Sequence, residues 1–389
     1  MDFELSPEQR DLQVAVRAFA EEVVAPAAAE ADARAEFPTE TVKRMAQLGL
    51  FGIAFPEELG GQGGDLLSFC LCIEEIARYD SSLAITLEAA AGLAANAVFR
   101  FGTDEQKRRW LVPMARGEAI GAFALTEPGG GTDARAVRTT ARLDGDEWVI
   151  DGSKAFITNS GTPLTSVIVV AALDEEASDG DLTTIVVPAG SAGVTVGPPY
   201  RKVGWRASDT HEVSFDACRV PADHLLGERG RGYAQFLETL ADGRVAIAAL
   251  SVGLARGCLE ESVRYAGERE AFGEPIGSFE ALQFKIADMK VGVETARLAF
   301  QRAAWLRDRG RPFATEASIA KLYASEVAVS AAREAVQVHG GYGFVEEFPV
   351  ARFYRDAKVL EIGEGTSEIQ RLLIARALGL PAELGDTDA

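Results

Sequence analysis

The chain has 389 residues, 47% of them hydrophobic and 25% charged, which is typical of a globular protein with a large core. Its formal net charge of −20 disfavours duplex nucleic acid as the main ligand, because proteins of that class carry a basic excess. The acidic N-terminal residues are typical of a folded segment rather than of an export signal, so we expect a cytoplasmic protein. The sequence contains no metal-binding pattern and no long apolar run free of charge, so we expect neither a bound metal nor a membrane span.

Residues 1–119 carry the signals of helices. Ser6, Pro7 and Gln9 mark a helix start, because serine can cap it, proline suits the first turn and glutamine completes a capping box. Apolar residues then recur at helical spacing, and further helical segments follow between glycine- and proline-rich breaks such as FPEELGGQGGD. We therefore predict an N-terminal all-α domain over residues 1–119.

Short runs rich in β-branched residues mark residues 120–229. They are separated by glycine, proline and aspartate, and they are too short and too close together for β–α–β units. We predict strands at EWVID, SVIVVAAL, LTTIVVPA, GVTVG and HEVSFD. The segment should form a central antiparallel β domain.

Long helical segments return over residues 230–389. They are rich in alanine, glycine and leucine, and small residues allow helices to approach closely. Long helices of this kind usually form an antiparallel bundle. We predict a C-terminal helical bundle, so that the order along the chain is helical domain, β domain and helical bundle.

Two stretches of the β domain are candidates for ligand binding. FALTEPGGGTDA, residues 123–134, places three glycines before Thr132, where backbone N–H groups can approach a ligand; a flexible β-turn explains the same pattern. In KAFITN, residues 154–159, Phe156 and Thr158 face the same side of a strand and could bind one planar ligand; an ordinary half-buried strand is the alternative.

Two breaks between the long helices carry further candidates. In EREAFGEPIGSFEALQFK, residues 268–285, Arg269 could hold a phosphate or be a solvated cation at a helix C-terminus. QVHGGYGF, residues 337–344, contains His339, which we interpret as a structural loop histidine rather than a ligand or base.

LEIGEGTSEIQ, residues 360–370, places Glu364 between Gly363 and Gly365, just before a helix start near Thr366. Glycines on both sides let the side chain and a neighbouring N–H point into one cavity, and the free N–H groups of the helix start attract anions. A general base and an exposed loop acid both fit this pattern.

In this order, the motifs resemble the FAD-dependent acyl-CoA dehydrogenases of the short- or branched-chain bacterial type, over almost the whole chain. LTEPGGGTDA is similar to the flavin-loop pattern T-E-P-x-x-G-[ST]-D, and KAFITN to the strand beside the flavin ring. REAFGEPIGSFEALQFKIADM is similar to the C-terminal signature, and EGTSEIQRLLIAR to the segment with the catalytic base. The resemblance implies the fold of an N-terminal all-α domain, a central antiparallel β domain and a C-terminal four-helix bundle. It also implies FAD as cofactor, an acyl-CoA substrate from fatty acid metabolism, a homotetramer and an electron-transfer flavoprotein as acceptor.

The resemblance also implies which residues bind FAD. Those of the β domain are Leu125, Thr126, Gly131, Thr132, Phe156 and Thr158, with Phe156 at the isoalloxazine ring and Thr158 near N5. Those that would reach the FAD of a partner subunit are Arg269, Phe272, Gln283, Gln337, Gly340 and Gly341. Thr366 and Glu368, at the start of the last helix, would contact FAD as well.

By the same resemblance Glu364 is the general base. It removes the pro-R α-proton of the acyl thioester while a hydride moves from the β-carbon to flavin N5, and the backbone N–H of the base and a ribitol hydroxyl of FAD stabilise the enolate. A second branch of the family carries its base on a long helix, at the position of Gly243 here. Because glycine cannot act as a base, no other candidate for the base stands at that position. Arg244 and Gly365 are expected at the substrate, with Arg244 near the thioester and pantetheine end.

Two further positions bear on the substrate. Straight-chain relatives often carry tyrosine before the base, and Gly363 leaves volume for a branched or bulky short acyl chain. Glu88 aligns near the acyl pocket, where it would suit a polar acyl end, pair with an arginine or be a structural acid. The alternatives to a dehydrogenase are an oxidase, a desulfinase or an acyl-carrier-protein desaturase of the same fold, or a non-catalytic flavoprotein.

Overall fold

The N-terminal helices begin where the sequence supplies capping side chains. In the computed structural model, which describes residues 4–177 and 181–381, α1 (Pro7–Phe19) starts with the expected capping box. Ser6 Oγ accepts a hydrogen bond from the N–H of Gln9 at 3.2 Å, and Gln9 Oε1 accepts one from the N–H of Ser6 at 3.1 Å. Aspartate side chains cap α4 (Leu66–Ala77) and α5 (Ser81–Leu87). The other helices of this region are η1 (Ala20–Val24), α2 (Ala25–Arg34), α3 (Thr39–Gln47), η2 (Leu50–Gly52), η3 (Glu57–Leu59), α6 (Asn96–Phe101), α7 (Asp104–Gln106), η5 (Lys107–Leu111) and α8 (Val112–Ala115).

One helical run carries an acidic side chain into the core. α5 continues through η4 (Glu88–Ala95), a π-helical stretch, into α6. Within the described part of the chain, this run Ser81–Phe101 is long and apolar enough to cross a membrane, but 89% of its apolar window is buried inside the protein. It is therefore packed as a core helix, and Glu88 on it is 0% exposed.

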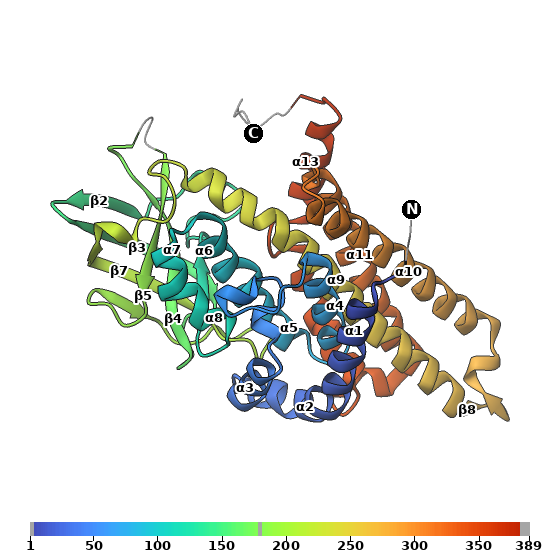
Figure 1. Ribbon diagram of the computed structural model, residues 1–389. Coiled ribbons are helices and arrows are strands. Elements are labelled where there is room, and N and C mark those ends of the chain that lie inside the picture. Colours follow the sequence, from blue (N-terminus) through green and yellow to red (C-terminus); the bar gives the residue numbers. More distant parts are fainter. Residues whose placement is uncertain (1–3, 178–180, 382–389) are drawn as a thin grey trace.

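Seven strands form one sheet at one end of the molecule (Figure 1). They are β1 (Ile120–Ala124), β2 (Thr140–Asp144), β3 (Glu147–Thr158), β4 (Thr165–Leu173), β5 (Leu182–Pro188), β6 (Val194–Val196) and β7 (Thr210–Pro221). Their order is β1–β4–β2–β3–β7–β6, with β5 paired to β4. The pairings of β1 and of β2 with β4 are parallel and the others antiparallel. The expected β domain is confirmed and all five predicted strands are present, but the prediction of an antiparallel sheet is wrong for the pairings of β1 and β2 with β4, which are parallel.

Three long helices dominate the C-terminal domain: α9 (Gly232–Glu268), α10 (Glu280–Asp308) and α11 (Ala314–His339). The shorter elements after them are η9 (Gly340–Phe344), α12 (Pro349–Ala357), η10 (Lys358–Glu361) and α13 (Ser367–Ala377). Fully buried alanines on α11 allow close packing against α9; they are Ala317, Ala320, Ala324 and Ala328. α9 runs from the β domain to the opposite end of the molecule, near the hairpin of β8 (Glu270–Ala271) and β9 (Glu274–Pro275) (Figure 1). The predicted order of helical domain, β domain and helical bundle is confirmed.

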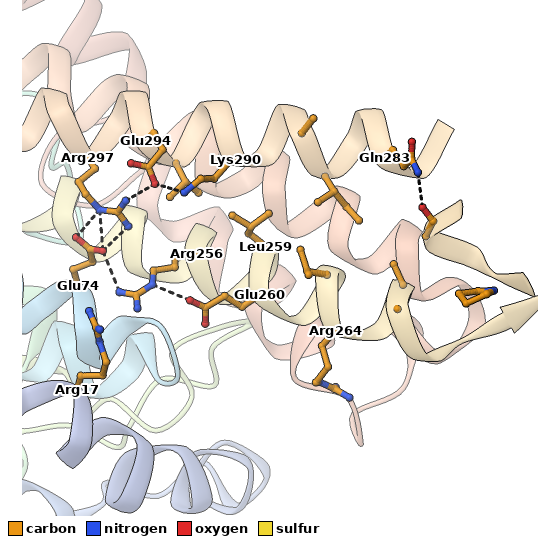
Figure 2. Close-up of a pocket in the computed structure, with 18 of the residues that line it drawn as sticks. Arg17, Glu74, Arg256, Leu259, Glu260, Arg264, Gln283, Lys290, Glu294 and Arg297 are labelled. Carbon is orange, nitrogen blue, oxygen red and sulfur yellow. Dashed lines mark hydrogen bonds and ion pairs between the residues drawn. The ribbon is translucent and has the colours of Figure 1, made fainter. Parts of the chain in front are cut away.

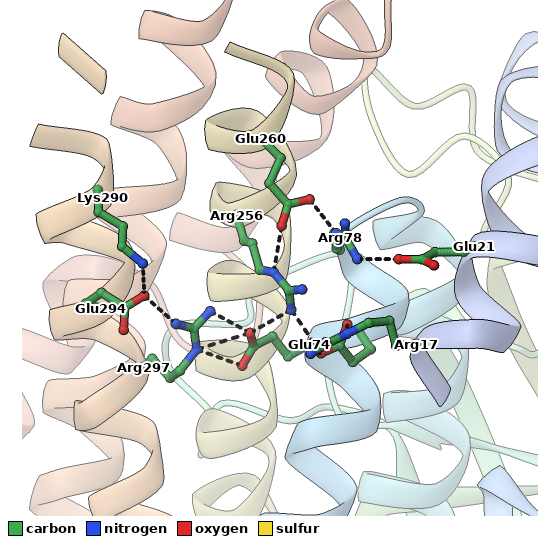
Figure 3. A network of polar contacts seen from close by, with 10 residues as sticks. Arg17, Glu21, Glu74, Arg78, Arg256, Glu260, Lys290, Glu294 and Arg297 are labelled. Carbon is green, nitrogen blue, oxygen red and sulfur yellow. Dashed lines mark hydrogen bonds and ion pairs between the residues drawn. The ribbon is translucent and has the colours of Figure 1, made fainter. Parts of the chain in front are cut away.

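A groove of about 1300 Å³ lies between α1, α9 and α10 (Figure 2). Charged residues from four helices meet there (Figure 3). Glu74 on α4 is 0% exposed and accepts a hydrogen bond from Arg297 Nη2 on α10 at 2.8 Å. The neighbouring Glu75 accepts from Arg17 on α1 and Arg256 on α9, each at 2.9 Å. This network joins the N-terminal helices to the bundle.

Candidate active site

Glu364 lies on a strained loop between η10 and α13. Its φ is +52° and that of Gly365 is +95°, and both values lie in the left-handed region that disfavours a side chain. The surroundings must therefore hold the glutamate in this conformation, as is common at functional sites. Thr366 caps α13 through Oγ1, which accepts a hydrogen bond from the N–H of Ile369 at 3.3 Å.

Two side chains hold the carbonyl groups of this loop. The ammonium group of Lys321 on α11 donates to the carbonyl oxygen of Gly365 at 2.7 Å. Gln370 Nε2 donates to the same oxygen at 3.0 Å and to the carbonyl oxygen of Glu364 at 3.3 Å. Across residues 4–177 and 181–381, no group accepts a hydrogen bond from the N–H of Glu364 or of Gly365. Two backbone donors are thereby left for a ligand.

The carboxyl group of Glu364 fills a space that Gly243 provides on α9. A Cβ at position 243 would lie 2.2 Å from Glu364 Oε2 and 2.9 Å from Leu93 Cδ2, so a side chain does not fit there without movement. The same Oε2 is buried and has no hydrogen-bond partner among the residues that the structure describes. The helix position that carries the base in a second branch of the resembled family thus faces the carboxyl of Glu364.

Side chains from three helices set the electrostatics of this carboxyl group. Burial raises the pKa of Glu364 to about 7, while a hydrogen bond from Glu88 and the charges of Lys321 and Arg244 oppose the rise. Burial also lowers the pKa of Lys321 to about 8, against the attraction of Glu364, and it lowers the pKa of Arg244. A carboxyl group with a pKa near 7 is suited to proton transfer at neutral pH.

The β-domain candidates gather around the end of β1 and a bulge in β3. The N–H of Ala155 donates to the carbonyl oxygen of Thr126 at 2.9 Å, which joins the glycine loop to the strand. Phe156 has a φ of +60° at the bulge, and its 64% exposed ring stacks on Tyr200 with the ring centroids 4.9 Å apart. Leu125, Thr126 and Thr158 are half-buried, whereas Gly131 and Thr132 are exposed.

The remaining candidates lie on the bundle. Arg269, Phe272, Gln283, Gln337, Gly340 and Gly341 are all exposed and lie at the end that carries the β8–β9 hairpin. Phe272 is 96% exposed, with a φ of +56°. The guanidinium of Arg269 lies 5.8 Å from the ring centroid of Tyr342, and Gln283 Nε2 donates to the carbonyl oxygen of Gly277 at 2.9 Å (Figure 2). Figure 1 shows this end far from the sheet, so one chain does not bring the two groups together.

These exposed residues suit a dinucleotide with a planar ring. Phe156 offers a flat apolar surface, and threonine hydroxyls lie near it in the β domain. No atom lies within 4 Å of a Cβ built at Gly129, Gly130, Gly340 or Gly341, so the backbone there is open to a ligand. The start of α13 adds the half-buried Thr366 and the exposed Glu368 together with unpaired helix N–H groups. The set matches the ring, the hydroxyls and the diphosphate of FAD.

Sequence reasoning missed four residues that build the site. Lys321 is 0% exposed on the alanine-lined face of α11. It stands four residues after Ala317 and four before Ser325, and this helical spacing could have predicted that it shares their buried face. Lys154 Nζ lies 2.8 Å from Glu127 Oε1, so a buried ion pair links the glycine loop to the strand that carries Phe156. The fourth residue is Gln370, which is fully buried one turn into α13.

Comparison with known sequences gives one consistent result. Models of the N-terminal, middle and C-terminal domains of acyl-CoA dehydrogenases match residues 6–118, 122–218 and 230–379. A probable acyl-CoA dehydrogenase of Bacillus subtilis (strain 168) is 48% identical over 380 residues, which cover 97% of this chain and 100% of that protein. The short-chain specific acyl-CoA dehydrogenase of Clostridium acetobutylicum is 43% identical over 375 residues, which cover 96% of this chain and 99% of that protein.

Solved structures have the same fold. Butyryl-CoA dehydrogenase from Megasphaera elsdenii superposes with a TM-score of 0.95 at 41% identity, over 98% of this chain and 100% of that one. A chain from structural work on the electron transferring flavoprotein of Acidaminococcus fermentans also gives 0.95 at 41% identity, over 97% and 99%. An acyl-CoA dehydrogenase complexed with FAD from Bacillus anthracis gives 0.91 at 34% identity, over 96% and 67%.

Proposed function

The chain belongs to the acyl-CoA dehydrogenase family, and we propose that it oxidises a short or branched acyl-CoA to the 2-enoyl-CoA with Glu364 as the base. It is an oxidoreductase that acts on a CH–CH bond, with FAD as its cofactor. The observation that carries the assignment of the base is the buried carboxyl group of Glu364. The group lies on a loop in which the backbone N–H groups of Glu364 and Gly365 donate hydrogen bonds to no described residue.

FAD, when bound, supplies the two-electron acceptor and takes the substrate β-hydride at N5. We assign the ring face to Phe156, with Thr158 beside N5. The other contacts proposed from the same chain are Leu125, Thr126, Gly131, Thr132, Thr366 and Glu368. The exposed, open positions of the glycine loop and of Phe156 support this assignment.

Glu364 takes the α-proton, and its loop stabilises the charge that develops. The α-proton of a thioester is weakly acidic, so the carbonyl oxygen needs hydrogen-bond donors as it becomes negative. Lys321 and Gln370 hold the carbonyl groups of the loop, which leaves the N–H of Glu364 for the substrate oxygen. Removing one such donor typically costs roughly 100-fold to 1000-fold in rate. Gly365 supplies the close backbone approach, and Arg244 is assigned to the thioester end.

The acyl chain is proposed to be short, straight or branched. A Cβ at Gly363 would meet only the carbonyl oxygen of Val359, at 3.6 Å, so the position before the base leaves open space. This supports acceptance of a branch near the reacting carbons. The short-chain specificity in the names of the similar clostridial and Megasphaera proteins supports a short chain.

We also propose a cytoplasmic homotetramer whose FAD sites are shared between subunits. Phe272 and Phe344 are 96% and 88% exposed at the hairpin end of the bundle. On α10, the exposed side chains of Phe284, Val291 and Leu298 recur every seven residues and form an apolar stripe. Exposed apolar surface of this extent is typical of protein contacts. Electron-transfer flavoprotein is the acceptor we propose, supported by the similarity to the Acidaminococcus chain.

Anaerobic mixing of the purified flavoprotein with short straight and branched acyl-CoAs tests the proposal. One of them should bleach the flavin absorbance of the wild type, while Glu364→Gln should bind the same acyl-CoA and keep its flavin oxidised. The assignment fails if no acyl-CoA bleaches the flavin, or if Glu364→Gln is reduced at the wild-type rate. Rapid peroxide formation without an added acceptor would instead indicate an oxidase, and preference for a carrier-protein thioester would indicate a desaturase.

A further inference from the structure

A second buried carboxyl group lies beside the base. Glu88 projects from η4, its exposure is 0%, and its Oε1 lies 3.0 Å from a Cβ built at Gly92 on the next helical turn. Within the described residues, neither of its oxygens meets an N–H or O–H donor. η4 packs against α9, where the carboxyl group of Glu364 occupies the space at Gly243, and this carboxyl group acts on Glu88 through its charge and a hydrogen bond.

The cations near this pair serve Glu364 and its loop rather than Glu88. Lys321 donates to the carbonyl oxygen of Gly365, and its charge and that of Arg244 act on Glu364. Glu88 has no such help: burial and then the charge of Glu364 raise its pKa well above the usual range. The outer groups Glu361 and Glu368, from η10 and α13, act on Lys321, and Tyr233 on α9 acts on Arg244.

Two neighbouring buried carboxyl groups are not both ionised, because each charge destabilises the other. One of them must hold a proton and donate it in a hydrogen bond to the other. The nearby cations favour the ionised form of Glu364, so the proton belongs on Glu88. Only a protonated Glu88 carries an O–H group, which it can donate in a hydrogen bond to the ionised carboxyl group of Glu364.

We propose that Glu88 is a proton-holding positioning residue: it stays neutral and donates a hydrogen bond that keeps Glu364 ionised and oriented in the free enzyme. The inference rests on the proposed role of Glu364 as base. In the reaction, the α-proton moves to Glu364 and the proton of Glu88 stays in place, so the pair passes from one negative charge to none. Glu88 thus keeps Glu364 in the form that can accept the α-proton, and it does not accept a proton itself.

Infrared spectroscopy tests the protonation state without turnover. At neutral pH, the difference between the spectra of wild-type holoenzyme and Glu88→Gln should contain the C=O stretch of one protonated carboxylic acid. Asp356→Asn serves as a control, because Asp356 is also fully buried but lies on α12 and bonds Ser81 and the backbone of Trp205. Absence of a Glu88-dependent carboxylic acid band overturns the proposal.

The pH dependence of kcat/KM tests the consequence for the base. Glu88→Leu removes the donor, so the acidic limb of the profile should move to higher pH by about one unit, which is a roughly tenfold loss of kcat/KM on that limb. Glu88→Gln keeps an N–H donor and should show a smaller shift, while Asp356→Asn should leave the limb in place.

The outcomes separate this proposal from the assignment of the base. A limb that is unchanged in Glu88→Leu overturns the role of Glu88. A limb that moves to lower pH in Glu88→Gln overturns it as well, because that result would mean that wild-type Glu88 is ionised. Neither result bears on Glu364, whose role fails if no acyl-CoA bleaches the flavin or if the flavin of Glu364→Gln is reduced at the wild-type rate.

Discussion

Gly243 provides the space that the carboxyl group of Glu364 occupies. Gly243→Ala puts a Cβ 2.2 Å from Glu364 Oε2, so the carboxyl group or α9 must shift. A displacement of about 1 Å at a reacting group can cost on the order of 100-fold in rate, and we expect a loss of this size in flavin reduction. Stopped-flow measurement of flavin bleaching reads it directly.

Gly267→Ala is the matched control for this prediction. Gly267 lies in the same helix, and no atom lies within 4 Å of a Cβ built there. Alanine is favoured over glycine in a helix by about 1 kcal/mol, so this variant should keep its rate and gain up to that much stability. A wild-type rate of flavin reduction in Gly243→Ala would contradict the packing described above.

The raised pKa of Glu364 also predicts how folding stability depends on pH. Burial raises this pKa from 4.5 to about 7, so the folded protein binds the proton more tightly than the unfolded chain does. The stability that this proton contributes is fully present below pH 4.5 and is lost as the pH rises through about 7. Glu364→Gln has no proton to lose, so its Tm should rise relative to wild type between about pH 5 and pH 8, by an amount equivalent to at most roughly 3 kcal/mol.

Calorimetry of the two holoproteins over this range measures the difference. Because other titrating groups are common to both proteins, their contributions largely cancel in the comparison. A Tm difference that stays constant from acidic to alkaline pH would show that the carboxyl group of Glu364 titrates as it does in the unfolded chain.

At the scale of elements, local signals predicted more than long-range ones. The start of α1 was predictable because Ser6 and Gln9 satisfy each other within one turn. The parallel pairing of β1 with β4 was not, because the two strands are separated in sequence by β2 and β3 and their choice of partner depends on packing that no short motif records. The burial of Lys321 also depends on long-range packing and was not predictable for that reason. A lone lysine is usually exposed, and this one is enclosed only because α11 packs against its neighbours.

The ion pair between Glu74 and Arg297 holds α4 against α10 and can be tested as a unit. Among the described residues, Arg297→Met leaves the fully buried Glu74 with one weak ion pair, to Arg256 Nη1 at 3.4 Å. Stranding a buried charge typically costs about 3 to 5 kcal/mol, and we expect a loss near the lower end in urea unfolding. Adding Glu74→Gln to Arg297→Met should recover most of it, because no charge is then left unpaired.

Glu294→Gln is the control for that measurement, since Glu294 also bonds Arg297 but is partly exposed. Its free energy of unfolding should change by less than about 1 kcal/mol. A double variant as unstable as Arg297→Met alone would mean that the loss comes from the packing of the arginine stem rather than from the stranded carboxylate.

At the scale of the whole molecule, the resemblance implied both a catalytic glutamate and FAD sites shared between subunits, but the sequence alone did not show how far apart the two groups of candidate residues lie in one chain. The glycine flanks pointed to Glu364, and the motif order pointed to the cofactor. The distance between the β domain, which carries Phe156, and the hairpin end of the bundle, which carries Arg269 and Phe272, becomes visible only once α9 is seen to run from one to the other (Figure 1).

This separation predicts complementation between two inactive variants. In a symmetric pair, each FAD site would take Glu364 from one chain and Arg269 with Phe272 from the other. Glu364→Gln alone and Arg269→Ala/Phe272→Ala alone should each be nearly inactive, the second also losing FAD on dilution. A mixed pair of the two has one site with both defects and one site with neither, so co-expression should restore about a quarter of wild-type activity if subunits assort randomly within pairs. If each site were built from one chain, every site in the mixture would carry a defect, and activity no greater than the sum of the two variants would contradict the shared site.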